Sequence, residues 1–167
     1  RMKSEIGILY LNEFNRKVLK KIMKANGLIF TELFIAKPHV FISSRHPLAT
    51  KRKVTLSELD EYPYLSFEQG EHNSFYYAEE MLSDVPRRKN IRVRDRATLF
   101  NLLIGLNGYT ICSGVIYEEL NGKDIIAVEL EAAGRMQVGY VMHEKGVLSR
   151  LGTIYLEALK KICEGYR

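Results

Sequence analysis

Hydrophobic and polar positions follow two different periods along this chain. The runs EIGILYL (5–11), LIFTELFIA (28–36) and HVFISS (39–44) have the length and the β-branched and aromatic content of strands. Between the first two runs, apolar residues repeat at helical spacing over about 13–26, and Gly27 is placed to end that helix in the left-handed conformation. The chain therefore begins with a strand, a helix and two further strand segments.

Lys37-Pro38 separates the second and third strand segments. Proline has no backbone N–H to donate to a central strand ladder, so the break should interrupt the pairing. We expect the chain to cross from one lobe to another at this point.

Local signals predict the rest of the chain. Thr55-Leu56-Ser57-Glu58 has the form of a capping box, so a short helix should begin there. Asn73 or Ser74 can cap a helix that runs to about Asp84, and Asp95 is a good cap for 96–105. The other expected elements are strands at 62–67, 91–95, 109–114, 124–129 and 136–143, and helices at 115–121 and 149–165.

Strand and helix alternate almost throughout, which favours an α/β fold with mostly parallel sheets covered by helices. In such sheets ligands bind beyond the carboxyl ends of the strands, where helix N-termini also gather. We expect a ligand site at an edge of this kind.

Composition places the chain among folded proteins. Its 167 residues are 46% hydrophobic and 27% charged, which are ordinary globular values. No apolar run approaches the ~20 residues of a membrane span, and RMKSEIGILYL lacks the pattern of a secretory signal. Cys112 and Cys163 form no metal-type or redox pair, which fits a reducing compartment. We expect a cytoplasmic protein without membrane contact.

The formal charge of +5 comes largely from three basic segments, at 16–24, 51–53 and 87–96. In the first, the cations share one helical face and Val18, Leu19, Ile22 and Met23 share the other. Neither stacking aromatic residues nor a recognition motif accompanies the charge. We therefore interpret 16–24 as an amphipathic helix with a solvated basic face, and we do not predict that it contacts DNA directly.

Polar residues after three predicted strands are the candidate ligand-binding residues. The stretch SFEQGEHNSF (66–75) is either a ligand loop or a solvent loop in which Asn73 caps its own helix. Unsatisfied amides at a helix N-terminus favour an anion. Arg96 can pair with such an anion or face solvent, and Thr98 can donate a hydrogen bond to it, whereas Asp95 is interpreted as a plain N-cap. Ser113 lies at the carboxyl end of a further strand.

Catalysis and metal binding find little support in the sequence. TICSG (110–114) does not match the G-x-S-x-G nucleophile elbow, and Cys112 in an apolar strand is expected to be a small core residue. His46 has no partner carboxylate at a recognisable spacing, so a structural role is expected. His39, His143 and Glu144 do not have metal-ligand spacing. We expect no enzymatic activity, no metal and no cofactor.

The segment SSRHPLATKRKVTLSELDEYPYLSFEQG (43–70) resembles the effector-binding domain of LysR-type transcriptional regulators. That family shows a strand, HPLA, a basic spacer, a turn of the form vtl-x-x-L, and a strand ending in a polar ligand loop. Three further stretches agree in order: EIGIL (5–9) is similar to the family's DIGI strand, GLNGYTICSG (105–114) to its glycine-rich turn and strand, and the last helix to its C-terminal helix. The resemblance covers about residues 4–164.

The resemblance implies two Rossmann-like lobes joined by two crossing strands, the type 2 periplasmic-binding-protein-like fold. Lobe I would comprise 1–36 with 137–167, and lobe II 37–136. The resemblance implies that a small effector, expected to be a carboxylate or other anion, would bind between the lobes and change how paired DNA-binding domains sit on an operator. By position, the family's cleft residues match Gln69, His72, Asn73, Ser74 and Phe75. The family also implies a homo-oligomer.

Two departures from the family pattern affect these expectations. The family's DNA-binding domain and the first part of lobe I have no counterpart here, so the resemblance implies a C-terminal fragment that reaches DNA only through a missing domain. Such a fragment should bind effector weakly and expose a sheet edge that promotes self-association. Ser113-Gly114 stands where many members have proline, so the entry to the next helix should differ.

Two other functional classes stay open from the sequence. A solute-binding receptor of a transporter can share the two-lobe fold, and an export signal upstream would favour it. An enzyme that uses Cys112 or His72 is the third possibility. If thiol alkylation at Cys112 left every measured activity intact, this possibility would lose its best nucleophile.

Overall fold

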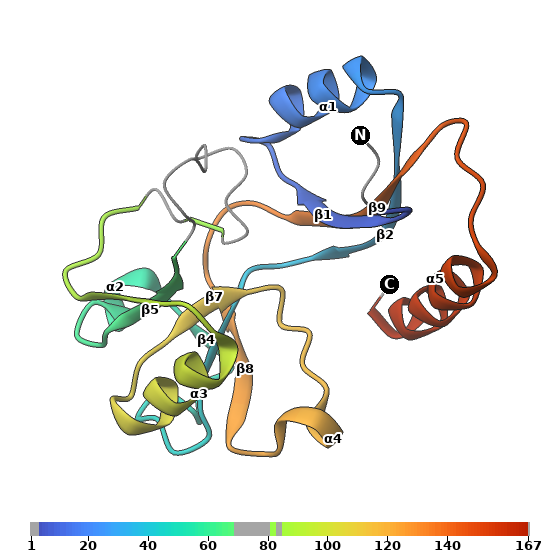
Figure 1. The fold of residues 1–167 in the computed structure, drawn as a ribbon. Helices are drawn as coiled ribbons and strands as arrows, with labels where there is room; N and C mark the ends of the chain where they lie inside the picture. The colour runs from blue at the N-terminus through green and yellow to red at the C-terminus, as the bar shows by residue number, and fades with distance from the viewer. Residues whose placement is uncertain (1–3, 69–80, 83–84, 167) are drawn as a thin grey trace. The chain divides into compact units, whose positions relative to one another are not determined.

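The structure is a computed structural model that describes residues 4–68, 81–82 and 85–166. The chain forms two compact units, which Figure 1 shows with their labelled elements. Unit 1 comprises Arg1–Ala36 and Gly134–Arg167, and Unit 2 comprises Lys37–Ala133. The strands are β1 (Gly7–Leu11), β2 (Leu28–Ala36), β3 (His39–Ser43), β4 (Lys53–Val54), β5 (Tyr64–Phe67), β6 (Asn90–Val93), β7 (Thr110–Cys112), β8 (Ile125–Leu130) and β9 (Met136–His143). The helices are α1 (Arg16–Ala25), α2 (Leu56–Leu59), α3 (Arg96–Gly105), α4 (Glu118–Asn121), α5 (Arg150–Cys163) and the 3-10 turn η2 (Glu164–Tyr166).

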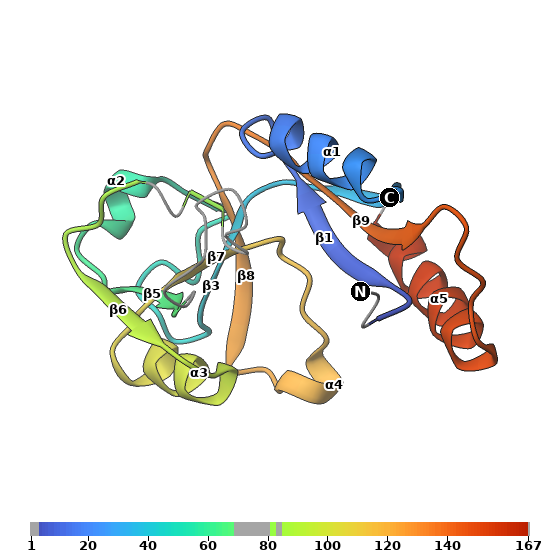
Figure 2. The same cartoon turned by 45° about the horizontal axis from the view of Figure 1, so that its top comes forward.

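Unit 1 is a three-stranded sheet with a helix on each face. Its strand order is β1-β9-β2, and both pairs are antiparallel. Figures 1 and 2 both show α1 and α5 on opposite sides of this sheet. Side chains alternate between the two faces along each strand. One face therefore packs against α1 and the other against α5.

Helix α1 forms because apolar side chains recur on one of its faces. Leu19 and Met23, one turn apart, are 8% and 6% exposed and pack with Leu11 from β1. Gly27 has φ of +61°, the left-handed conformation that ends a helix at little cost only for glycine. The predicted helix end is thus confirmed, and partly buried Leu9, Leu28, Phe30 and Val141 complete this small core.

Unit 2 contains the larger core. Its main sheet has the order β4-β8-β3-β7, and β5 pairs with β6 in a second, parallel ladder. A parallel bridge between Tyr64 and Tyr109 joins β5 to the beginning of β7. Leu99 and Leu103 of α3 are 1% and 0% exposed and pack on both ladders. Burial of one such leucine contributes roughly 1.5–3 kcal/mol.

The strand directions differ from the sequence-based expectation of mostly parallel sheets. The pairs β1·β9, β2·β9, β3·β7 and β3·β8 are all antiparallel. Among the described strands, the parallel pairs are β4·β8 and β5·β6, besides the single bridge from β5 to the beginning of β7. The connection between the units accounts for two of these antiparallel pairs, β2·β9 and β3·β8. The chain leaves Unit 1 through β2 and β3 and returns through β8 and β9, so the outgoing and returning strands run in opposite directions and pair with each other.

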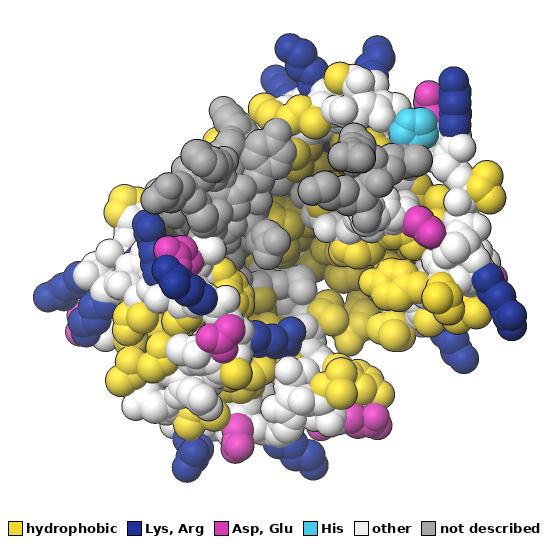
Figure 3. All heavy atoms as spheres, viewed as in Figure 1, with side chains coloured by type: hydrophobic (Ala, Val, Ile, Leu, Met, Phe, Trp, Pro, Cys, Tyr) yellow, Lys and Arg dark blue, Asp and Glu magenta, His cyan; other side chains and the backbone are white. Residues whose placement is uncertain are grey.

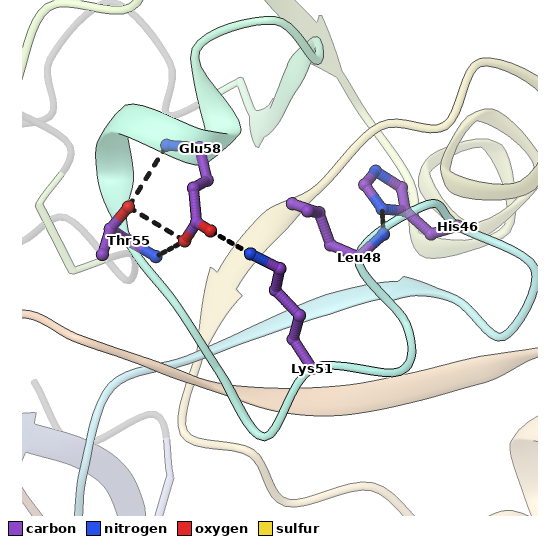
Figure 4. Close-up of polar contacts among 5 residues, drawn as sticks. All are labelled: His46, Leu48, Lys51, Thr55 and Glu58. Atoms are coloured by element: carbon purple, nitrogen blue, oxygen red, sulfur yellow. Dashed lines mark hydrogen bonds and ion pairs between the residues drawn. The ribbon is translucent and has the colours of Figure 1, made fainter.

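The turn after β3 is held by His46, whose side chain is 3% exposed. Its Nδ1 accepts a hydrogen bond from the Leu48 amide at 3.0 Å (Figure 4). Its Nε2 lies 3.0 Å from the Asn107 carbonyl oxygen. Because Nδ1 is the acceptor, Nε2 carries the proton and donates. The imidazole ring also lies 4.3 Å from the Tyr62 ring, centroid to centroid. His46 thus ties three segments together, which agrees with a structural role.

The capping box at Thr55 is confirmed. The Glu58 amide donates to Thr55 Oγ1 at 3.3 Å, and the Thr55 amide donates to Glu58 Oε2 at 2.8 Å (Figure 4). Lys51 donates to the other oxygen of the Glu58 carboxylate. Hydrogen bonds from Lys51 and then Thr55 lower the pKa of Glu58 to about 2.

Candidate functional site

The carboxyl ends of β7, β5 and β6 lie at one edge within Unit 2, because β5 is parallel to both of its neighbours. The described residues that follow these strands are Ser113 after β7, Glu68 after β5, and the start of α3 after β6. The parallel pairing places the backbone at these three positions at one edge of the ladder. We refer to this set of residues as the carboxyl edge.

The N-terminus of α3 is occupied by a carboxylate of the chain itself. Asp95 Oδ1 accepts from the Thr98 amide at 2.8 Å, and Thr98 Oγ1 donates to Asp95 Oδ2 at 2.8 Å. The hydrogen bonds from Thr98 lower the pKa of Asp95, so the cap is ionised at neutral pH. This confirms Asp95 as the N-cap and shows that the Thr98 hydroxyl is used locally in this structure.

Arg96 is exposed and lies beside α3. Its guanidinium carbon is 4.8 Å from the centre of the Phe100 ring, and one Nη donates to Asn121 Oδ1 at 3.1 Å. No carboxylate forms an ion pair with Arg96 among the described residues. The Phe100 ring and the Asn121 side-chain amide hold the Arg96 guanidinium in place without neutralising its charge, so Arg96 can still attract an anion.

Ser113 follows β7 in a turn that needs glycine at the next position. Its Oγ accepts from the Val115 amide at 3.4 Å. Gly114 has φ of +80°, and an added Cβ would lie 2.7 Å from the His39 ring. The ring nitrogen Nδ1 of His39 lies 2.9 Å from the Lys37 carbonyl oxygen, which fixes the ring in that position. The backbone at Ser113 is thus set by the packing of Gly114 on His39.

An ion pair at the carboxyl edge escaped the sequence analysis. Arg94 Nε donates to Glu68 Oε2, and the Glu68 amide donates to the Val93 carbonyl oxygen at 2.8 Å. The hydrogen bond from Arg94 lowers the pKa of Glu68. Phe67 pairs with Val93 in the parallel ladder, and each is followed by a charged residue, Glu68 and Arg94, of opposite sign. The pairing of these charges could be predicted only from the register of the two strands. That register was not evident from either strand alone.

Five of the predicted ligand-binding residues lie outside the described residues: Gln69, His72, Asn73, Ser74 and Phe75. Arg96, Thr98 and Ser113 are described, and the structure brings their backbones to the same edge of the β7-β5-β6 ladder. These three form the described part of the candidate site.

Cys112 does not have the properties of a nucleophile. Burial raises the pKa of its thiol to about 12, so the thiolate is scarce at neutral pH. Within the described ranges, no group of His, Cys, Asp or Glu side chains is arranged to hold a metal ion. The same residues include no helix long and apolar enough to cross a membrane.

Unit 1 has a surface hollow of about 610 Å³ between α1 and the sheet. The residues that line it include Met23, Phe30, two lysines and two glutamates, namely Lys20, Lys24, Glu32 and Glu144. A smaller hollow of about 210 Å³ is lined by Glu5, His143, Gly146, Val147 and Leu148 with Ser4 and Met142.

Comparisons with known proteins match the LysR regulators. The family model of the LysR substrate binding domain matches residues 6–163. HinK, a LysR family transcriptional regulator from Pseudomonas aeruginosa, superposes with a TM-score of 0.60 at 13% identity, covering 95% of this chain and 52% of that chain. This chain therefore spans about half the length of that regulator. No curated protein sequence matches the chain significantly.

Two of the similar structures contain small molecules. The effector binding domain of QuiR in complex with shikimate has a TM-score of 0.59 at 15% identity, covering 98% of this chain and 74% of that chain. The regulatory domain of CcmR from Synechocystis PCC6803 in complex with 2-PG has a TM-score of 0.61 at 12% identity, covering 96% and 74%.

At these identities the similar structures establish the fold alone. They and the family model confirm the expected class, the two-lobe periplasmic-binding-protein-like α/β fold. The family is assigned from the family model, which matches residues 6–163. The chain belongs to the LysR substrate-binding domain family.

Proposed function

We propose that this chain is the effector-binding regulatory domain of a LysR-type transcriptional regulator and that it senses a small carboxylate or other anion. The observation that carries the proposal is the family match together with the carboxyl edge of Unit 2. The similar domains of QuiR and CcmR, which hold shikimate and 2-PG, support a small molecule as the ligand class. The proposed site combines Arg96, Thr98 and Ser113 with the segment Gln69, His72, Asn73, Ser74 and Phe75.

Charge at the carboxyl edge supports an anionic ligand. Arg96 keeps its positive charge without a described acidic partner, whereas Arg94 is already paired with Glu68. Asp95 occupies the α3 N-terminus, so the helix end itself offers less to an anion than the sequence suggested. The cation that contacts the ligand is therefore expected to be Arg96.

Signal transmission belongs to the same proposal. Ligand that binds one arrangement of the two lobes better than another shifts the population of arrangements, and DNA-binding domains paired through a homo-oligomer read that shift. The DNA-binding domain is expected to lie on a part of the regulator that this chain does not match. We propose no catalytic step, in agreement with a family of transcriptional regulators.

The test is a thermal-shift screen of small carboxylates and inorganic anions against the chain and two variants. A ligand that binds only the folded state raises the midpoint of unfolding. We expect Arg96→Ala to lower the affinity for the best ligand of the screen roughly tenfold or more, since a charge-assisted hydrogen bond is lost. The matched control is Arg88→Ala, because Arg88 pairs with Glu61 and precedes the amino end of β6. Equal loss in both variants would refute the proposed role of Arg96.

A further inference from the structure

Helix α1 carries an uninterrupted row of cations. Arg16, Lys17, Lys20, Lys21 and Lys24 are all exposed, and the helix Arg16–Ala25 contains no acidic residue. Lys and Arg side chains gather over α1 in Figure 3. Lys17 and Lys24 are seven residues apart, so the row runs about 10 Å along the helix axis.

The other two basic segments differ from α1 because each contains cations that pair with acidic side chains. Lys53 Nζ lies 3.0 Å from Glu129 Oε1, and Lys51 pairs with Glu58. Arg88 and Arg94 likewise pair with Glu61 and Glu68.

On α1, Arg16 donates to the amide oxygen of Gln137 at 3.3 Å. None of the four lysines has an acidic partner within 4 Å among residues 4–68, 81–82 and 85–166. Even the Glu32 and Glu144 carboxylates, which line the same hollow as Lys20 and Lys24, form no ion pair with them.

Repulsion within α1 makes this arrangement unfavourable for the isolated helix. Lys17 and Lys21, and likewise Lys20 and Lys24, are four residues apart, where like charges destabilise a helix. A polyanion laid along the row would remove this repulsion. The row therefore fits an interaction surface better than a surface that only supports the fold.

The buried face of α1 narrows the class of partner. A basic amphipathic helix can insert its apolar face into a membrane or a partner groove. Here Leu19 and Met23 are already packed on the sheet of Unit 1, at 8% and 6% exposure, so only the charged face is available. Duplex DNA presents one negative charge per roughly 1.7 Å of its axis, and contacts to its phosphates need no stacking aromatic residue or recognition motif.

We propose that the lysines of α1 bind the phosphate backbone of duplex DNA without sequence preference. This differs from our sequence-based expectation of a solvated helix face, because the sequence could not show which basic segments are neutralised by acidic side chains. The inference does not depend on the effector site. It would add a contact with DNA, on Unit 1, to the one that the proposed function assigns to a separate DNA-binding domain.

The experiment measures binding of a labelled mixed-sequence duplex of about 20 base pairs by fluorescence anisotropy, at salt concentrations from 20 to 200 mM. The α1 variant is Lys17→Gln/Lys20→Gln/Lys21→Gln. The matched control is Lys51→Gln/Arg52→Gln/Lys53→Gln, which also lowers the formal charge by three, from +5 to +2. All six positions are exposed.

For the unmodified chain we expect a dissociation constant of roughly 10⁻⁴–10⁻⁶ M that weakens steeply with salt. The α1 variant should bind at least tenfold more weakly, and its slope of log K against log salt should be shallower by about 2–3. The affinity of the control variant for the duplex should fall by less than about threefold. Equal losses in both variants, or no binding by the unmodified chain at low salt, would overturn the inference.

A footprint on the unmodified chain tests the same inference without substitutions. Duplex DNA should protect Lys17, Lys20 and Lys21 from acetylation and leave Lys51 and Lys53 reactive. Anionic phospholipid vesicles serve as the competing polyanion. Protection by vesicles but not by the duplex would assign the row to a lipid surface and overturn the proposal for DNA.

Discussion

The two units of the chain bury their apolar side chains to different extents. Among residues 4–68, 81–82 and 85–166, ten of the thirteen exposed large hydrophobic side chains belong to Unit 1, including Ile29, Leu151 and Ile162 at 55%, 77% and 62% exposure. In Unit 2, Leu65, Leu99 and Leu103 are 0–1% exposed in one cluster. In the described part of the chain, Unit 2 therefore buries most of its large apolar side chains, whereas Unit 1 leaves more apolar surface uncovered. We expect Unit 2 to be the more stable of the two.

The largest expected effect comes from the core of Unit 2. Leu103→Ala removes a fully buried side chain and leaves a cavity, so it should lower the free energy of unfolding by about 2–5 kcal/mol. Ile162→Ala on α5 of Unit 1 is the matched control, because its side chain is 62% exposed and the change should stay within about 0.5 kcal/mol. Urea unfolding measures both variants. Similar losses at the two positions would contradict the comparison.

A smaller effect is expected at the N-cap of α2. Thr55→Ala removes the acceptor for the Glu58 amide and should destabilise Unit 2 by about 1 kcal/mol. Thr55→Ser keeps the hydroxyl and should cost only a fraction of that. In Unit 1, Ser149 caps α5 by accepting from the Gly152 amide at 3.1 Å, so Ser149→Ala provides the equivalent change there. Hydrogen exchange at α2 and α5 reports each unit separately.

The smallest expected effect is a dependence on pH in Unit 2. Burial lowers the pKa of His46, so the unfolded chain binds more protons than the folded chain once pH falls below about 6.5. Stability should be complete above that pH and should decline as pH falls towards the lowered pKa. Protonation of Nδ1 would also remove the acceptor for the Leu48 amide. Thermal melts between pH 7.5 and 5 test this, and His46→Gln should flatten the profile if His46 is the cause.

Local features of the fold followed from the sequence, and the pairing of distant strands did not. The end of α1 at Gly27, the caps at Thr55 and Asp95 and the break at Lys37-Pro38 each depend on neighbouring residues, so the sequence predicted them. The relative direction of β2 and β9, and of β3 and β8, depends on where the chain leaves Unit 1 and where it returns. Local sequence patterns do not show these positions. The short strand β4 was missed because two residues carry no periodicity.

The candidate site shows the same division. The sequence singled out Arg96, Thr98 and Ser113 as residues that follow strands, and the parallel ladder brings their backbones to one edge. It did not reveal that Thr98 is bonded to Asp95 or that Arg94 is paired with Glu68. Those contacts depend on side-chain geometry and on the register of two strands separated by more than twenty residues. The hydrogen bonds and ion pairs of these residues could therefore not be predicted from the sequence.

The central claim, a small-anion site at the carboxyl edge of Unit 2, is tested most directly by following backbone amide resonances during titration. The titrant is the carboxylate that gives the largest thermal shift in the screen, with sodium chloride at equal ionic strength as the control. We predict saturable shifts concentrated at 94–98 and 113–115. Shifts confined to the cations of α1, or no saturable shift at any of these positions, would contradict the claim.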